Sequence, residues 1–304
     1  MSMQQHTIVV DGKPTTRSRQ WLSGFGLIAA GFVWLFCFLI GPLIALGILA
    51  FASKDDYGEI IWTFSTDNFW RMFGWGLFGW TSDNLWIIGR SIVLASATTF
   101  CCLALGFPLA FWIAARPPTW RPLLLALVMV PACVNLIIRT YAWRLILGNE
   151  APPAALAQWA GLVEPGAALY PSSIAVYLGM ISAMLPFAVL PLYTSVERVD
   201  WSVVEAARDL YARGWRTFRH GILSQTVPGL IAATILTLIP SLGMFVVSDL
   251  LGGAKYMLVG NLIQQQFGAG SDWPFGAMLG LGLIVASLVS LIILMRWGAK
   301  EGHL

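Results

Sequence analysis

The chain has 304 residues, of which 58% are apolar and only 11% are charged, with a net charge of +3. Because roughly a quarter of the residues in soluble domains are charged, this composition excludes an ordinary soluble globular protein. A mean hydropathy of +0.74 indicates an integral membrane protein instead.

Six apolar runs are long enough to cross a membrane, whose hydrocarbon core of about 30 Å needs about 20 residues of helix. The runs are Trp21 to Phe51, Leu85 to Ala115, Pro122 to Leu147, Ile174 to Thr194, Val227 to Val247 and Phe275 to Met295. Helices close their own backbone hydrogen bonds in lipid. We therefore predict an all-α membrane protein with six transmembrane helices, in which residues 1–20 form a cytoplasmic tail and residues 21–304 the transmembrane domain. The first run exceeds the usual length of a signal peptide core, so we expect it to be retained as an anchor.

Basic residues are distributed unevenly between the two sides of this predicted topology. Twelve of the eighteen Lys and Arg residues share a side with the N-terminus: Lys13, Arg17, Arg19, Arg116, Arg121, Arg198, Arg208, Arg213, Arg216, Arg219, Arg296 and Lys300. The positive-inside rule then predicts that both termini are cytoplasmic. Acidic residues show the opposite bias, and a mildly acidic outer face would suit a cationic solute.

The largest inner loop, residues 197–226, combines many charges with a helix-start signal. The run from Ser202 to Glu205 matches a capping box, and Asp200 offers a second possible cap, so a short helix is predicted to begin near Val203. The positive-inside bias alone could account for the arginines of this loop. A capped helix, however, has a defined shape that a cytoplasmic partner can bind.

The run Glu205-Ala206-Ala207 in this loop resembles the EAA signature of permease subunits of ATP-binding-cassette importers. Further similarity extends over nearly the whole chain from the first apolar run, and spermidine/putrescine-type permeases resemble it most. Four runs carry that resemblance: Ile138 to Trp143, Leu185 to Tyr193, Ser248 to Lys255, and Asp272 to Gly276.

The resemblance implies a type I importer permease fold in the bacterial inner membrane. It also implies one permease of a pair, two ATPase subunits inside and an extracytoplasmic solute-binding protein outside. The loop would contain the coupling helix that docks on the ATPase. The residues assigned to coupling on this basis are Glu205, Ala206, Ala207, Asp209 and Gly214.

Two positions depart from the pattern of the family. Tyr211 stands where the family has glycine, and Ser224 stands where it has proline. Glycine adopts the left-handed conformation that ends a helix at little cost, whereas tyrosine in that conformation costs about 1 kcal/mol or more. Because Gly214 lies about one turn further on, we predict that the coupling helix continues to Gly214 and stops there.

No motif for covalent chemistry is present in the sequence. The chain contains no G-x-x-x-x-G-K-[ST] phosphate loop, so ATP hydrolysis is expected from partner subunits and not from this chain. The three histidines are not spaced as metal ligands. We expect a transport subunit with no catalytic residue, no cofactor, no metal and no nucleic acid partner, in contact with membrane lipid.

Polar and aromatic residues near the outer ends of the predicted spans are the candidates for the solute path, because such groups at membrane depth usually face a bundle interior or water. The candidates are Asp249, Asn135, Tyr141 and Trp143. A carboxylate attracts a cation, and aromatic faces offer cation–π contacts. The alternatives are an interfacial aromatic belt and an acidic residue that only ends the fifth span. Arg139 and Arg144 are expected to reach the outer headgroups.

The aromatic outer loop, Ile60 to Trp86, allows two interpretations: an amphipathic segment lying on the membrane or a docking surface for the binding protein. Three functions stay open as well. The first is a polyamine permease, the second is a permease of the same architecture for an opine, amino acid or metal chelate, and the third is an uncoupled membrane scaffold.

Overall fold

The computed structural model describes residues 31–55, 59–76, 79–161, 163–164, 166–210, 214–253 and 256–301. The predicted tail and the first ten residues of the first apolar run therefore lie outside the described residues. The chain divides into two compact units, residues 1–48 and 49–304, which are described separately.

The first unit contains one apolar helical segment, Gly31–Ala50, which reaches two residues into the second unit and is long enough to cross a membrane. Its residues Phe36–Ile40 form a π-helical turn, η1, and Gly41–Ala50 form α2. Because every turn of this segment is apolar, lipid is a suitable environment for all of its faces.

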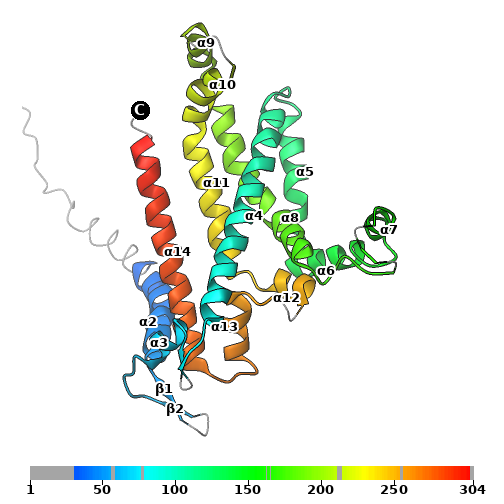
Figure 1. Ribbon diagram of the computed structural model, residues 1–304. Coiled ribbons are helices and arrows are strands. Elements are labelled where there is room, and N and C mark those ends of the chain that lie inside the picture. The colour runs from blue at the N-terminus through cyan, green and yellow to red at the C-terminus, as the bar shows by residue number, and fades with distance from the viewer. Residues whose placement is uncertain are drawn as a thin grey trace, which may run out of the picture. The chain divides into compact units, whose positions relative to one another are not determined.

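The second unit consists of helices joined by short connections (Figure 1). The helices are α3 (Asp67–Met72), α4 (Asp83–Ala114), α5 (Arg121–Cys133), α6 (Leu136–Ile146), α7 (Pro152–Trp159), α8 (Ser173–Glu197), α9 (Trp201–Leu210), α10 (Gly214–Thr217), η2 (Phe218–Leu223), α11 (Ser224–Gly243), α12 (Val246–Gly252), α13 (Val259–Phe267) and α14 (Trp273–Glu301). Two short antiparallel pairs also occur: β1 (Ser53–Lys54) with β2 (Ile60–Ile61), and β3 (Trp75–Gly76) with β4 (Gly79–Trp80).

Five helical segments of the described chain are long and apolar enough to span a membrane, and a bent pair of helices makes a sixth candidate. The segments in the second unit are Asp83–Ala114, Ser173–Glu197, Gly214–Gly243 and Trp273–Gly298, with the bent pair Arg121–Cys133 and Leu136–Ile146. The apolar runs of the sequence thus correctly located all six candidates.

Helices α4, α8 and α11 pack against one another and form the main core. Glycines allow the close approach. A Cβ added at Gly229 of α11 would lie 2.3 Å from the Cβ of Ser195 and 2.7 Å from the carbonyl oxygen of Pro191 on α8. Small residues at helix contacts are typical of membrane bundles, where close packing replaces the hydrophobic driving force.

The third predicted span is not one continuous helix. Helices α5 and α6 meet at 90°, because Val134 adopts an extended conformation (φ −82°, ψ 137°) and Asn135 then starts a new helix by accepting a hydrogen bond from the N–H of Ile137 at 2.8 Å. Arg139 donates to the carbonyl oxygen of Pro131 across the bend at 2.9 Å. The expectation of an unbroken helix from Pro122 to Leu147 was therefore wrong, and the Arg139 guanidinium bonds to the backbone at the bend.

The fifth span also ends earlier than predicted. Helix α11 ends at Gly243, since Met244 has an extended conformation (φ −76°, ψ 111°) and the chain then turns into α12. Asp249 consequently belongs to the separate helix α12 and not to the end of the span.

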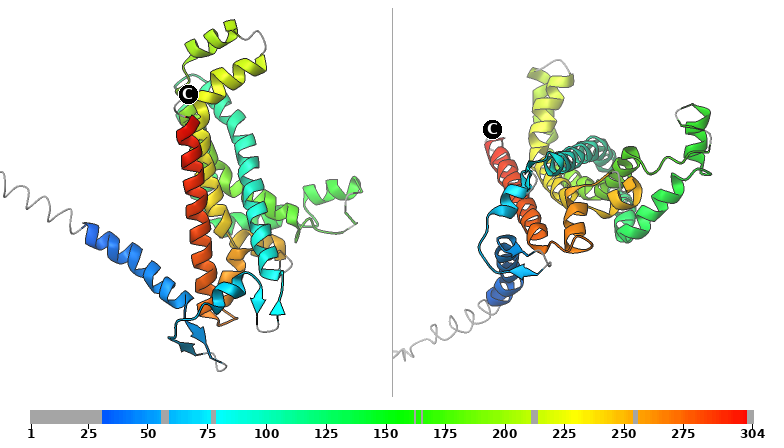
Figure 2. Two further views of the ribbon diagram at one scale, coloured as in Figure 1. Left: turned by 60° about the vertical axis from the view of Figure 1, so that its left-hand side comes forward. Right: turned by 60° about the horizontal axis from the view of Figure 1, so that its bottom comes forward.

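Helices α9 and α10 lie at one end of the bundle, and α3, α12 and α13 lie toward the other (Figures 1 and 2).

Candidate coupling and solute sites

Helix α9 carries the Glu205-Ala206-Ala207 run and begins two residues earlier than the sequence predicted. Asp200 Oδ1 accepts hydrogen bonds from the Ser202 hydroxyl at 2.8 Å and from the Ser202 N–H at 2.9 Å, as an N-cap carboxylate does. These two hydrogen bonds lower the pKa of Asp200 below its usual value. Asp200 is therefore the cap, and the predicted box starting at Ser202 is wrong because Ser202 lies inside the helix.

Gln225 fixes the start of α9 to the following span. Its side-chain oxygen accepts from the N–H of Asp200 at 2.9 Å, and its amide nitrogen donates to the carbonyl oxygen of Asp200 at 3.3 Å and to that of Gly221 at 2.6 Å. Gln225, which is the second residue of the apolar helix α11, was not predicted from the sequence. A glutamine at the start of an apolar run is the signal that could have drawn attention to it.

Most of α9 is exposed to solvent. Val204 is buried and anchors the helix, whereas Glu205, Ala206 and Asp209 are exposed. The backbone of Ala207 is helical, but its side chain lies outside the described part of the chain. Helix α9 packs on η2 and α10. The helix thus presents an accessible surface at this end of the bundle, as a docking element requires.

Gly214 does not have the predicted position at the end of the coupling helix. It is the first residue of α10, and its φ is outside the left-handed region. Tyr211 lies outside the described residues. The glycine therefore begins the second short helix of the loop and does not form a left-handed C-cap.

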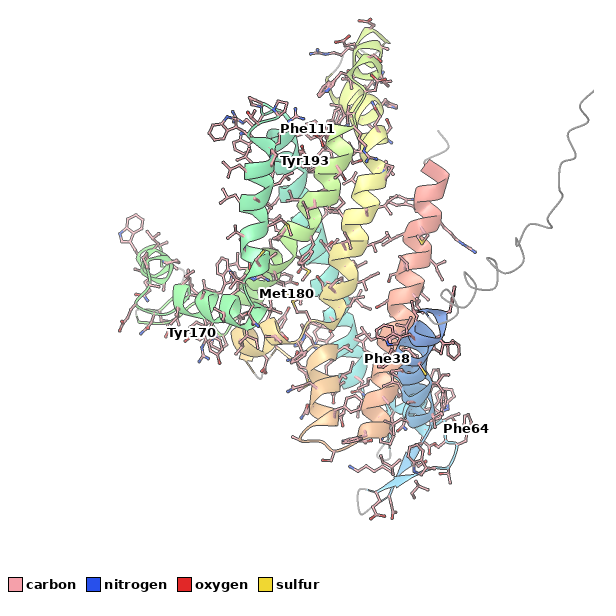
Figure 3. All side chains as sticks on the ribbon, turned by 180° about the vertical axis from the view of Figure 1, so that it is seen from behind. Phe38, Phe64, Phe111, Tyr170, Met180 and Tyr193 are labelled. Carbon is pink, nitrogen blue, oxygen red and sulfur yellow. The ribbon has the colours of Figure 1, made fainter. Side chains whose placement is uncertain are left out.

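A charged cluster links α5 and α8 just before the chain enters α9. Arg121 Nη1 lies 3.0 Å from Glu197 Oε1, and the Tyr193 hydroxyl donates to the same oxygen at 2.8 Å. Arg121 Nε also donates to the carbonyl oxygen of Arg116 at 2.8 Å. Tyr193 lies near this end of the bundle, close to Phe111 (Figure 3). The cluster holds the α4–α5 turn against the end of α8.

The four candidates for the solute path come from two neighbouring helices, α6 and α12, which pack against each other. Trp143 donates from Nε1 to the Ser182 hydroxyl at 2.7 Å, and its ring packs against the core of α8 and α12. Asn135 is the α6 cap described above. Tyr141 and Asp249 are exposed. The structure therefore gives Trp143 and Asn135 structural contacts, while Tyr141 and Asp249 present accessible groups.

A buried polar contact holds α12 beside α13. The Ser248 hydroxyl donates to Asn261 Oδ1 at 2.6 Å, and the same oxygen accepts from the N–H of Leu258 at 3.2 Å. Gly252 is also required by packing, because an added Cβ would lie 2.6 Å from the Cβ of Tyr256. Asp249 thus lies on a helix that is held in place by the hydrogen bond of Ser248 and by the close packing of Gly252.

The opposite end of the bundle is held by an ion pair that sequence reasoning did not find. Arg71 of α3 lies 2.8 Å from Asp272, which begins the Asp272 to Gly276 run, and the Arg71 guanidinium lies 4.4 Å from the centre of the Phe275 ring. A cavity of about 460 Å³ adjoins this pair. Its lining includes Asp67, Trp70 and Trp75. Carboxylates and indoles therefore converge at the end of the bundle away from α9.

Multiple apolar spans, a capped exposed helix at one end and a polar, aromatic surface at the other define a membrane transport subunit. The model of the family "binding-protein-dependent transport system inner membrane component" matches residues 103–297. The chain belongs to this family. It is a multi-pass inner-membrane permease subunit of an ATP-binding-cassette importer and not an enzyme, since ATP hydrolysis resides in partner subunits.

Curated relatives extend over almost the full chain. The spermidine/putrescine transport system permease protein PotB of Escherichia coli (strain K12) is 36% identical over 270 residues, which cover 88% of this chain and 94% of the relative. PotB of Haemophilus influenzae is 34% identical and covers 90% and 93% of the two chains. The inner membrane ABC transporter permease protein YdcU of Escherichia coli is 31% identical, with coverage of 91% and 96%.

Solved structures agree in fold. A bacterial alginate ABC transporter, in complex with an alginate pentasaccharide-bound periplasmic protein, has a chain that matches with a TM-score of 0.71 over 94% of this chain and 96% of its own. The MetNI methionine ABC transporter matches with a TM-score of 0.53 over 73% and 99%. At 16% and 15% identity, these similarities concern the fold, which is that of type I importer permeases.

Proposed function

We propose that this permease imports polyamines, namely spermidine, putrescine or a related cationic solute. The observation that carries the proposal is the identity of 34 to 36% to PotB proteins over nearly the whole length of both chains. Exposed Asp249 and Tyr141 on adjoining helices support it, because a carboxylate and an aromatic face are the groups that attract an alkylammonium ion. In this proposal Asn135 and Trp143 hold the surrounding backbone and core of the solute path.

The same proposal assigns the partners and the coupling element. The chain pairs with a second permease subunit, binds ATPase subunits in the cytoplasm and receives solute from an extracytoplasmic binding protein. Residues 197–226 form the coupling loop of the 21–304 transmembrane domain, and residues 1–20 the cytoplasmic tail. Within the loop, Glu205, Ala206, Ala207 and Asp209 contribute to the docking surface, and Gly214 starts the second helix beside it.

Reconstitution of the complete importer tests the solute. Proteoliposomes that contain both permeases and the ATPase, with the binding protein outside, should accumulate radiolabelled spermidine or putrescine when ATP is enclosed in the lumen, which corresponds to the cytoplasmic side. Competition separates the alternatives, because an excess of an opine, an amino acid or a metal chelate should leave polyamine uptake unchanged. Uptake of one of those solutes in place of polyamine would refute the assignment. An uncoupled scaffold would give neither uptake nor stimulated ATP hydrolysis.

The coupling role has its own test in Glu205→Ala. Within the described part of the chain Glu205 makes no hydrogen bond or ion pair, so its removal should leave the thermal stability of the isolated subunit unchanged. A charge-assisted hydrogen bond to the ATPase is worth about 1.5 to 3 kcal/mol. Solute-stimulated ATP hydrolysis should therefore fall about tenfold or more. Normal stimulated hydrolysis in this variant would refute the proposed docking role of Glu205.

A further inference from the structure

The turn between α4 and α5 contains a groove that includes none of the residues proposed for coupling or for the solute path. The groove has a volume of about 500 Å³ and is lined by Trp112, Arg116, Pro117, Trp120 and Leu124. Pockets of about 300 to 1,000 Å³ are the usual size for small ligands. The lining is largely apolar and contains one cationic group.

The position of the groove places it at the inner surface of the membrane. Helix α4 is a membrane span that ends at Ala114, and α5 begins at Arg121, so the groove lies where two spans leave the apolar layer. Arg121 pairs with Glu197, which directly precedes the α9 loop, so the groove lies at the end of the bundle that the positive-inside rule assigns to the cytoplasm. Exposed indoles at this level are typical of a membrane interface.

The arginine of the groove is held in a fixed place. Its guanidinium carbon lies 4.5 Å from the centre of the Trp112 ring, a cation–π geometry. Among the described residues no carboxylate forms an ion pair with Arg116. The neighbouring Arg121, in contrast, is fully engaged with Glu197 and with the carbonyl oxygen of Arg116. One oriented positive charge therefore remains available in the groove.

The backbone of the turn forms hydrogen bonds of its own, so the groove is present without a ligand. The N–H of Arg116 donates to the carbonyl oxygen of Ile113 at 3.0 Å, and the N–H of Trp120 donates to that of Pro117 at 3.0 Å. Helix α5 has no side-chain cap in the described structure, and its positively polarised N-terminus opens on this turn. Both the arginine and the helix end favour an anion next to an apolar wall.

We propose that this groove binds an anionic phospholipid of the inner leaflet. The headgroup phosphate pairs with Arg116, and the glycerol and upper acyl chains lie against Trp112, Trp120 and Leu124. Charge complementarity selects the anionic class, because the cytoplasmic leaflet carries the negative lipids and basic pockets at span ends on this side bind their headgroups. A zwitterionic lipid fits the same apolar wall but brings no net charge to the arginine.

Native mass spectrometry of the full-length chain tests the proposal by titration with phosphatidylglycerol and with phosphatidylcholine of the same acyl chains. Wild-type protein should retain phosphatidylglycerol at lower lipid concentration. Arg116→Gln should weaken phosphatidylglycerol binding about fivefold, the effect of one basic residue at an anionic surface. Phosphatidylcholine also has a phosphate but no net charge, so its binding should weaken less. The matched control is Arg296→Gln, which removes an exposed arginine at the inner end of α14 and should bind like wild type.

Two additional measurements separate a phospholipid site from a folding defect and from binding of a small anion. Arg116→Lys keeps the charge, so it should retain most of the preference for phosphatidylglycerol, whereas a folding defect caused by loss of the arginine side chain would reduce binding in both variants. Inorganic phosphate at millimolar concentration should fail to displace the lipid, because the acyl contacts belong to the site. Equal affinity of wild type for both lipids, an equal loss in Arg296→Gln, or complete displacement by inorganic phosphate would each overturn the phospholipid site.

Discussion

The side chain of Gln225 forms hydrogen bonds with both backbone groups of Asp200, accepting from its N–H at 2.9 Å and donating to its carbonyl oxygen at 3.3 Å. Asp200 caps α9, and Gln225 is the second residue of α11, 25 residues further along the chain. A movement of α9 therefore acts directly on the first turn of a membrane span. The contact gives the exposed helix a rigid connection to the bundle.

Gln225→Ala removes this connection. Each lost hydrogen bond costs about 0.5 to 1.5 kcal/mol, so amide hydrogen exchange in α9 should accelerate about tenfold while the spans stay protected. Under the proposed coupling role, solute-stimulated ATP hydrolysis should fall as well. Gln265→Ala, an exposed glutamine of α13, is the control and should change neither quantity. Unchanged exchange in α9 would contradict the structural role of Gln225.

The ion pair between Arg71 and Asp272 predicts a cost for neutralising Asp272. The carboxylate also accepts from the N–H of Phe275 at 3.2 Å, and its side chain is only 12% exposed. Asp272→Asn keeps the shape but removes the charge, so the subunit should lose about 1 to 3 kcal/mol of stability in thermal unfolding. Asp83→Asn, at an exposed acid in the first turn of α4, is the control and should cost less, about 0.3 to 1 kcal/mol from the lost interaction with the helix dipole.

A double-mutant cycle separates this pair from general charge effects. Arg71→Gln combined with Asp272→Asn should cost less than the sum of the single changes, because residues in direct contact are not additive. Strict additivity would mean that the two side chains do not interact in solution.

The contact of α11 with α8 at Gly229 leaves no room for a side chain. Gly229→Ala would put a Cβ 2.3 Å from Ser195 and 2.7 Å from the Pro191 carbonyl oxygen, so the helices must separate. Overpacking of this kind costs about 1 to 3 kcal/mol, which should lower the thermal midpoint. Gly89→Ala is the matched control, since a Cβ there meets nothing within 4 Å and alanine is the better helix former. A normal midpoint for Gly229→Ala would show that this contact is loose.

Asp249→Asn tests the solute path. The exposed carboxylate attracts an alkylammonium ion by about 1 kcal/mol at contact in water and more in a drier site. Polyamine uptake at low solute concentration should therefore drop several-fold. Because an exposed charge is screened by salt, the difference from wild type should narrow at high ionic strength. Glu150→Gln, another exposed acid, is the control. Wild-type uptake by Asp249→Asn in assembled complexes would assign this residue a structural role only.

The spans could be predicted from the sequence because hydropathy depends only on the number of apolar residues in a run. The bend after α5 could not be found in this way. Val134 and Pro131 are themselves apolar, so the run continues while the backbone changes direction. Asn135 within an apolar run was recognised as unusual, but its role as a helix cap depends on the conformation of the residue before it.

The candidate coupling site was predicted in part. Asp200 and Ser202 are both good caps two residues apart, and local sequence does not decide between them. The structure selects Asp200 because Gln225 holds its backbone in place. The pair of Arg71 and Asp272 joins residues 201 positions apart, so it follows from how the outer elements pack and not from any local pattern.

The bend between α5 and α6 has a consequence for assembly. With 13 residues, α5 is about 20 Å long at 1.5 Å per residue, which is shorter than the hydrocarbon layer. Val134 and Asn135 therefore carry non-helical backbone at membrane depth, and both are exposed in the single chain. The N–H of Val134 donates to Pro131 and the carbonyl oxygen of Asn135 accepts from the N–H of Arg139, but lipid cannot satisfy any backbone group that the bend leaves free. Under the proposed assembly, a neighbouring subunit or a water-filled passage therefore covers this corner, and the bend marks the side of the single chain that is completed by its surroundings.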